Sequence, residues 1–490
     1  MLDSLRDVLV TPAEMTAIDD AAAASGIDSF ALMRSAGMAV SAAALRLFPE
    51  ALRFVVLCGP GNNGGDGYVA ASALVDGGAD VAVFALGNPE TLKGDAARAQ
   101  GACPLAVQPL AAYEPQLGDV VIDALFGAGL TRDLPAQAQG TIARVSESHV
   151  PVIAVDLPSG VDGRTGEIRG ASFTAVHTVT FMARKPGHLL MPGRVRCGTL
   201  EVFDIGIPAR LVSDGAGDLR LNTPTIWGSH ASTLDPATHK YRRGHLGVLS
   251  GGSLSTGAAR LSATAGLAAG AGLVTLASPA EALAVNASHL TAVMLREIQG
   301  TDDLATWLKD KRVNAFVLGP GFGVGKKARG FALMLCDRAL VLDADGMTSF
   351  EKDRTELFER AASGGQLVMT PHEGEFARLF PEIAADAALS KIEKAQAAAR
   401  MSHAVVVYKG PDTVVAAPSG RVVVNANAPP SLATAGSGDV LAGIIGAHLA
   451  QGIPAFEAAA AAVWRHGEAG TRAGRSMTAE TLVECIPPLP

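Results

Sequence analysis

The chain has 490 residues, of which 48% are hydrophobic and 18% charged, and its formal net charge is −8. At about 100–200 residues per domain, this length predicts two to four domains, large enough to bury cores without disulfides. The apolar content excludes a disordered protein, and the acidic balance excludes the basic footprint of a general nucleic-acid binder. The 5 cysteines are dispersed and form no CxxC pair. This pattern favours a reducing, cytoplasmic setting over a disulfide scaffold or a zinc cluster.

Short β-branched runs that end in Gly, Asp or Pro alternate with alanine-rich helical stretches along most of the chain. The clearest runs lie at 54–61, 120–127, 152–160, 315–321, 339–346 and 405–411. Near-continuous apolar strands between helices predict parallel α/β sheets, with the chemistry carried by loops at the strand carboxyl ends. The uncharged stretch at 261–280 is broken by glycines, so we expect a buried helix, a turn and a strand there rather than a membrane span.

The alternation lapses between residues 207 and 243, where prolines, glycines and scattered polar residues replace it. We expect a linker there, with at most a short strand or docking arm, and a boundary near 215–225. A fresh strand begins at His245. The expected domains are therefore 1–218 and 219–490. The acidic residues near the N-terminus stand where a signal peptide needs its apolar core.

Three strand ends in the first half carry Gly, Asn, Asp or Ser. The first is GPGNNGGDG at 59–67, the second VIDALFGAG at 121–129, and the third VDLPSGVDG at 155–163. Glycines let backbone amides approach a ligand, and a following helix N-terminus favours an anion. Each loop alone reads as a turn or a helix cap. Three on neighbouring strand ends favour a ligand site, and their oxygen donors suit a monovalent cation better than a transition metal.

These motifs, with the opening at 11–37 and the segment at 180–188, resemble the NAD(P)H-hydrate epimerase domain over about residues 8–210. The resemblance implies a Rossmann-like three-layer sandwich that interconverts the R and S hydrates of nicotinamide cofactors. It places a potassium ion near Asn63, Asp123 and Ser159, and gives Lys185 no firm role. It places the substrate on Asn62, Asn63, Gly64, Gly65, Asp66, Gly127, Ala128, Gly129, Leu130, Thr131, Arg132, Asp133 and Asp156. Epimerisation needs a proton acceptor and donor at the hydroxylated carbon, and Asp156 is our candidate.

The strongest motif of the second half is ATAGSGDVLAG at 433–443, which leads into an apolar helix. A Gly-Ser-Gly turn at a helix start offers backbone N–H groups to a transferring phosphoryl group. Asp439 stands where it can accept a proton from an attacking hydroxyl. The alternative is a simple helix N-cap, but the context of the motif weighs against it. Three earlier strand ends carry GPGFG at 319–323, TPHEGEF at 370–376 and KGPDT at 409–413.

This half resembles the ribokinase-like superfamily and, within it, the nucleotide-dependent NAD(P)H-hydrate dehydratases, over about residues 225–488. Further matching segments are 244–252, 256–274 and 342–346, whereas the prolines at 429 and 430 depart from a Gly-rich lead-in. The resemblance implies that Asp439 deprotonates the ring hydroxyl of the S hydrate, that ADP with Mg²⁺ phosphorylates it, and that phosphate then leaves. It places the nucleotide on Lys409, Gly410, Pro411, Asp412, Thr413 and Gly438. It places the hydrate on Ala258, Gly321, His372 and Asp439.

The leading hypothesis is a fused epimerase and ADP-dependent dehydratase that repairs NADH and NADPH hydrates and releases AMP and phosphate. We expect a homo-oligomer with small-molecule substrates and with neither nucleic-acid nor membrane partners. The alternative is a ribokinase-like kinase of a vitamin or small molecule with an accessory ligand-binding domain, which would release a stable phosphorylated product. A third hypothesis makes the first half a binding module without catalysis.

Overall fold

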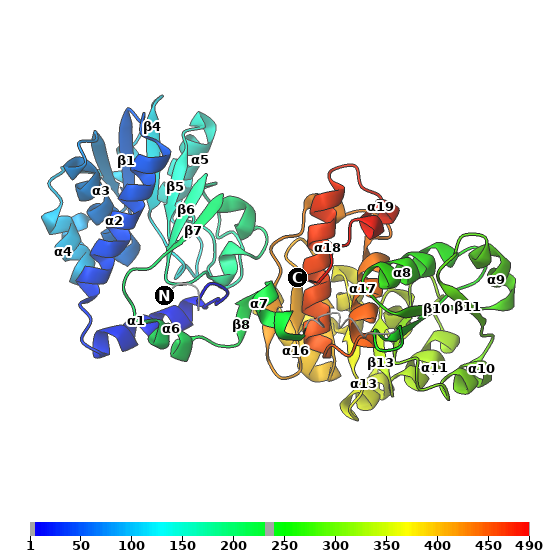
Figure 1. Ribbon diagram of the computed structural model, residues 1–490. Helices are drawn as coiled ribbons and strands as arrows, with labels where there is room; N and C mark the ends of the chain where they lie inside the picture. The colour runs from blue at the N-terminus through cyan, green and yellow to red at the C-terminus, as the bar shows by residue number, and fades with distance from the viewer. Residues whose placement is uncertain (1–4, 231–239, 490) are drawn as a thin grey trace. The chain divides into compact units, whose positions relative to one another are not determined.

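The computed structural model describes residues 5–230 and 240–489, and the chain divides into two compact units. Unit 1 is Met1–Leu219 and unit 2 is Arg220–Pro490. Each unit has its own sheet with helices packed on it (Figure 1), which confirms the expected α/β class.

Unit 1 contains a seven-stranded sheet in the order β3-β2-β1-β4-β5-β6-β7, in which every neighbouring pair is parallel. The strands are β1 (Arg53–Cys58), β2 (Val81–Ala85), β3 (Val107–Pro109), β4 (Asp119–Ala124), β5 (Val152–Val155), β6 (His177–Phe181) and β7 (Thr199–Phe203). The helices are α1 (Pro12–Ala24), α2 (Ser29–Leu47), α3 (Asn62–Asp76), α4 (Gly94–Ala102), α5 (Ala136–Ser148) and α6 (Ala209–Gly215). The order reverses between β1 and β4, where ligands of open α/β sheets bind.

Successive residues of β1 face opposite cores. Phe54, Val56 and Cys58 pack with α2 and α3, whereas Val55 and Leu57 pack with α5 on the other face. This alternation explains the continuous apolar run, because a strand covered on both faces buries every side chain.

One helix within the described residues, α2, has the length and apolar composition of a membrane span, and half of that stretch is buried inside unit 1. Its buried residues include Met33, Ala36 and Val40, which belong to the core shared with α3. Packing in the unit therefore accounts for the apolar composition of α2.

Unit 2 contains a ten-stranded sheet in the order β11-β10-β9-β12-β13-β14-β15-β16-β17-β8. The strands from β11 to β15 pair in parallel, while β15, β16 and β17 pair antiparallel. The sequence predicted only the parallel part. The strands are β8 (Leu219–Leu221), β9 (His245–Leu249), β10 (Leu273–Ser278), β11 (Met294–Glu297), β12 (Ala315–Leu318), β13 (Ala339–Leu342), β14 (Leu367–Met369), β15 (Val405–Tyr408), β16 (Val414–Ala416) and β17 (Val422–Val424).

The helices of unit 2 cover both faces of this sheet (Figure 1). They are α7 (Pro224–Trp227), α8 (Thr256–Ala268), α9 (Ala280–Ala287), α10 (Thr301–Trp307), α11 (Lys326–Leu335), α12 (Asp345–Thr348), α13 (Thr355–Ala362), α14 (Glu373–Leu379), α15 (Pro381–Ala385), α16 (Lys391–Ser402), α17 (Ser437–Ala450), α18 (Ala455–Ala473) and α19 (Ala479–Glu484). The almost wholly buried α17 packs against α8, α18 and α19. The stretch at 261–280 forms the end of α8, a turn at Gly270 and β10, as the sequence predicted.

Candidate functional sites

The loops that follow β1, β4 and β5 meet at the strand reversal of unit 1. A Cβ atom added to Gly127 would lie 2.9 Å from Oδ2 of Asp156 and 3.0 Å from Oδ1 of Asn63. The amide of Ala128 donates a hydrogen bond of 2.9 Å to Oδ2 of Asp156. Three of the predicted substrate segments therefore converge, and glycine at 127 leaves the room that their side chains need.

Asp156 is anchored by a buried cation. The Nζ atom of Lys185, whose side chain is 3% exposed, lies 2.8 Å from Oδ1 of Asp156. Nζ also donates to Oγ1 of Thr180 at 2.9 Å and to the carbonyl oxygen of Phe181 at 3.3 Å. The Thr180 hydroxyl donates in turn to Oδ1 of Asp156 at 2.9 Å. Burial alone would raise the pKa of Asp156, but Lys185 and these hydrogen bonds hold it below its ordinary value.

His188 fixes the backbone of the same site. Its Nε2 lies 2.7 Å from the carbonyl oxygen of Asp156, and its Nδ1 accepts the Lys185 amide at 2.9 Å. A carbonyl can only accept, so Nε2 carries the proton. Burial lowers the pKa of His188 to about 4, which agrees with a neutral ring. These bonds hold Asp156 at φ +64°, a conformation that costs energy for a residue with a side chain.

Asp123 and Ser159 lie in direct contact in the buried interior. Oδ2 of Asp123 accepts the Ser159 amide at 2.7 Å, and Oδ1 accepts its hydroxyl at 2.5 Å. Oγ of Ser159 also lies 3.1 Å from the carbonyl oxygen of Phe126. Burial raises the pKa of Asp123 to about 6, although the hydrogen bonds lower it, and the described residues give this carboxylate no ion-pair partner. A buried carboxylate among neutral oxygens fits a monovalent cation.

Asp66 lies on α3, one turn beyond Asn63, and residues three apart share a helix face. Burial raises the pKa of Asp66 well above its ordinary value, and the nearby Asp156 and Asp19 raise it further. The described residues include no hydrogen-bond or ion-pair partner for this carboxyl. Asp19 of α1, which the sequence analysis did not single out, thus joins the electrostatics of this site.

The other predicted substrate residues of unit 1 surround these contacts. Asn62, Gly64 and Gly65 lie in the first turn of α3. The side-chain amide nitrogen of Asn63, Nδ2, is buried without a hydrogen-bond partner among the described residues. In the loop after β4, Ala128 and Leu130 are buried, whereas Gly129, Thr131, Arg132 and Asp133 are exposed.

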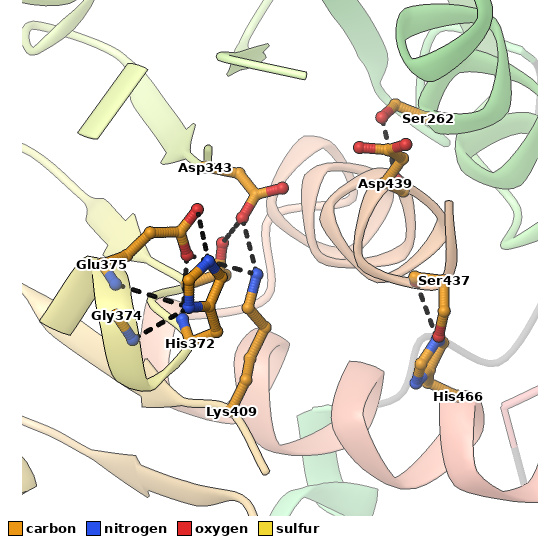
Figure 2. A network of polar contacts seen from close by, with 10 residues as sticks. Ser262, Asp343, His372, Gly374, Glu375, Lys409, Ser437, Asp439 and His466 are labelled. Atoms are coloured by element: carbon orange, nitrogen blue, oxygen red, sulfur yellow. Dashed lines mark hydrogen bonds and ion pairs between the residues drawn. The ribbon is translucent and has the colours of Figure 1, made fainter. Parts of the chain in front are cut away.

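In unit 2, neighbouring strand ends bring a lysine and two carboxylates together (Figure 2). Nζ of Lys409, after β15, lies 3.0 Å from Oδ1 of Asp343, after β13, and 3.8 Å from Oε2 of Glu375 on α14. Oγ1 of Thr370, after β14, donates to the same Asp343 oxygen at 2.6 Å. Burial would lower the pKa of Lys409, but the two carboxylates hold it above its ordinary value.

Asp439 lies in the first turn of α17, whose N-cap is the left-handed residue Gly436. Its backbone carbonyl accepts the Ser262 hydroxyl of α8 at 2.8 Å, and Figure 2 shows the carboxylate on the side of Asp343. Burial raises the pKa of Asp439 to about 6; Asp343 and Asp345 add to this rise, while Lys409 opposes it. A Cβ atom on Gly438 would stand 3.5 Å from Nζ of Lys409, so the lysine lies beside the turn.

The remaining predicted nucleotide residues form the turn after β15. The Thr413 hydroxyl donates to the carbonyl oxygen of Gly410 at 2.8 Å and accepts its amide at 3.2 Å. Asp412 is buried and pairs with Lys391 of α16, while Pro411 is exposed. This turn is therefore held by its own side chains close to Lys409.

Besides Asp439, the predicted hydrate residues come from three segments. A Cβ atom on Gly321 would lie 3.4 Å from Cβ of Ala258, so α8 and the loop after β12 are adjacent. His372 caps α14: its Nδ1 accepts the amides of Gly374 at 3.0 Å and Glu375 at 3.4 Å. The His372 side chain is 55% exposed, so it is open to a ligand.

The structure places five residues in these sites to which the sequence analysis gave no role: Asp343, Glu375, Thr180, His188 and Lys185. Asp343 and Glu375 do stand inside quoted motifs, LDADG and TPHEGEF, each directly after a strand. Position at a strand end was the available signal for these two. Thr180 lies within β6, where the sequence shows only an apolar strand.

Comparisons with known proteins agree for both units. Residues 29–187 match the family described as YjeF-related protein N-terminus, and residues 246–488 match the NAD(P)H-hydrate dehydratase family. A bifunctional NAD(P)H-hydrate repair enzyme Nnr of Moorella thermoacetica is 36% identical, covering 98% of this chain and 96% of its own length. Its Escherichia coli counterpart is 34% identical, covering 92% of this chain and 86% of its own length.

Among solved structures, an ADP/ATP-dependent NAD(P)H-hydrate dehydratase of Bacillus subtilis, co-crystallised with ATP and Mg²⁺, aligns with a TM-score of 0.47 at 22% identity. That alignment covers 54% of this chain and 95% of that chain. The near full-length identity to the repair enzymes, with both family matches in order, decides the family. The chain belongs to the bifunctional NAD(P)H-hydrate repair enzymes, which join an epimerase and a dehydratase of hydrated nicotinamide cofactors.

Proposed function

We propose that unit 2 dehydrates the S hydrate at Asp439 and Lys409, with ADP as the phosphoryl donor. The observation that carries this proposal is the carboxylate of Asp439, with a pKa of about 6, in the turn that lies beside the half-buried Lys409. A base whose pKa lies near the working pH is efficient at removing a hydroxyl proton. The lysine and the amides of the turn suit the charge on a transferring phosphoryl group.

The proposed reaction has two stages. Asp439 takes the proton from the ring hydroxyl, and the hydroxyl oxygen attacks the β-phosphorus of ADP, so that AMP leaves. The lone pair of the ring nitrogen then expels phosphate, and loss of a proton from the neighbouring ring carbon restores the dihydronicotinamide. Mg²⁺ bound to the nucleotide would supply further charge compensation at the phosphates.

Unit 1 interconverts the two hydrates at Asn63, Gly127 and Asp156. Loss and return of the stereocentre, by ring opening or by loss of water, needs one proton acceptor and one donor. Lys185 keeps Asp156 ionised, so this carboxylate is available as the acceptor, although its lowered pKa makes it a weaker base than Asp439. The raised pKa of Asp66 favours its protonated form and suits the donor. A potassium ion held by Asp123 and Ser159 would compensate the buried carboxylate and stiffen the loops after β4 and β5.

The test uses a mixture of R and S NADH hydrates with ADP, Mg²⁺ and K⁺, followed by dihydronicotinamide absorbance. Complete conversion, faster than spontaneous epimerisation, supports both halves of the proposal. Conversion that stops at the S fraction contradicts the epimerase assignment, and a stable phosphorylated product would favour the kinase alternative. Replacing K⁺ by Na⁺ should slow the epimerase alone. All five cysteines are unpaired, which supports a reducing compartment such as the cytoplasm.

A further inference from the structure

Asp343 is a buried carboxylate in unit 2 to which neither the sequence analysis nor the proposed reaction gives a role. It is 2% exposed and lies directly after β13. Its Oδ1 binds Lys409 at 3.0 Å and the Thr370 hydroxyl at 2.6 Å. A buried charge is costly unless it is paired, so this carboxylate and Lys409 stabilise each other.

The second oxygen of Asp343 is directed elsewhere. Figure 2 shows one carboxylate oxygen of Asp343 bonded to Lys409 and the other pointing towards the carboxylate of Asp439. Asp343 is therefore placed between the lysine of the proposed phosphate site and the proposed base. It touches the first of these groups and faces the second.

We propose that Asp343 is a positioning residue of the dehydratase, which holds the Lys409 ammonium at the nucleotide phosphates and faces Asp439 as a like charge. This inference rests on the proposed function of unit 2. Two effects follow from one side chain. Without Asp343, Lys409 loses its nearest anchor, because Glu375 lies 3.8 Å away. Without the negative charge of Asp343, Asp439 loses a neighbour that makes its own ionisation harder.

Several other groups around Asp439 also act on its pKa. Burial and Asp345 also raise its pKa, while Lys409 lowers it. Two groups near Asp439 on the packed helices are neutral: Ser262 on α8 bonds the Asp439 carbonyl, and His466 on α18 has a pKa lowered to about 4 by burial. Since Asp439 acts as a base only when ionised, the rate rises with pH through its pKa. This rise is the acid limb of the pH–rate profile. Removal of the Asp343 charge should move that limb to lower pH.

The test is Asp343→Asn in the full-length enzyme. The pH dependence of kcat/KM for the S hydrate should show an acid limb about 0.5–1 pH unit lower than in the wild type. The affinity for ADP, measured by calorimetry, should fall about tenfold because Lys409 is displaced. Asp345→Asn is the matched control. Asp345 faces Asp439 but bonds the Gly323 amide at 2.9 Å, so that variant should keep its ADP affinity.

Asp343→Glu separates position from charge. It keeps the negative charge but shifts the carboxylate, so we expect a wild-type acid limb with weakened ADP binding. An unchanged acid limb together with unchanged ADP affinity in Asp343→Asn overturns the inference. So does a greater Mg²⁺ requirement with an unmoved acid limb, which would assign Asp343 to the metal. A wild-type enzyme that binds ADP but dehydrates no hydrate refutes the proposed function. An active wild-type enzyme whose Asp343→Asn variant keeps both its acid limb and its ADP affinity refutes the inference alone.

Discussion

Replacement of Lys185 by Met removes the cation that holds Asp156 ionised. Lys185 is 3% exposed and Asp156 is 17% exposed, so the variant leaves a carboxylate largely buried without its partner. Breaking a buried pair by removal of one partner costs about 3–5 kcal/mol. Hydrogen bonds from Thr180 and Ala128 remain, so the lower end, about 3 kcal/mol, is the expected loss in the free energy of unfolding of unit 1 near neutral pH.

The loss in the free energy of unfolding should be larger at high pH than at low pH. In the wild type the folded pKa of Asp156 lies below its ordinary value, so its contribution to stability is constant above the unfolded pKa. In Lys185→Met, burial is no longer opposed by the cation, and the folded pKa rises above the unfolded one. The carboxylate then destabilises unit 1 most at about pH 8, and the effect shrinks towards about pH 5 as Asp156 takes up a proton.

The chain provides an internal control for this measurement. Its three tryptophans, Trp227, Trp307 and Trp464, all lie in unit 2. Hydrogen exchange of peptides from β5 and β6 should report the loss in unit 1, while denaturation followed by tryptophan fluorescence should be unchanged. Lys93→Met, at an exposed lysine of unit 1, is the matched variant. It should alter neither the hydrogen exchange of β5 and β6 nor the denaturation followed by tryptophan fluorescence. Equal exchange in Lys185→Met and wild type, or a loss independent of pH, would refute the reasoning.

Three further predictions concern the two sites and the core of unit 2. Gly127→Ala should raise the epimerase KM about tenfold or more, because its Cβ would stand 2.9 Å from Asp156 and 3.0 Å from Asn63; dehydration of pure S hydrate should be unaffected. Asp439→Asn should lower dehydratase kcat by about 10²–10⁴, with R/S exchange, measured by chromatography, unchanged. Arg465→Met should lower the stability of unit 2 by about 3 kcal/mol in tryptophan-detected denaturation, since the 1% exposed Arg465 binds backbone carbonyls at 2.8 and 3.0 Å.

The sequence predicted the strands well because parallel strands covered on both faces are continuous apolar runs. The run at 54–61, for example, contains β1 and the Gly-rich loop that opens α3. It did not predict the antiparallel strands β16 and β17, whose apolar runs are as short as three residues. Spacing along the chain brought Asn63, Gly127 and Asp156 to one sheet edge. It could not reveal that Lys185 is buried against Asp156, because that contact depends on how the segment after β6 folds back.

The two sites use lysine and aspartate in opposite ways, and the difference comes from the number of acceptors around each lysine. Among the described residues, Lys185 forms an ion pair with one carboxylate, Asp156, and donates its other hydrogen bonds to Thr180 and Phe181. Asp19 and Asp66 feel its charge from farther away. Its charge therefore acts most strongly on Asp156, which stays ionised.

Lys409 is shared between two carboxylates, Asp343 and Glu375, before Asp439 is counted. The charge that reaches Asp439 is thus already compensated, and burial raises its pKa to about 6. A carboxylate with that pKa can remove a proton and return it near neutral pH, as a base in phosphoryl transfer must. The number of carboxylates paired with each lysine, together with burial of the aspartate, therefore decides whether the nearby aspartate can hold a proton near neutral pH or stays ionised.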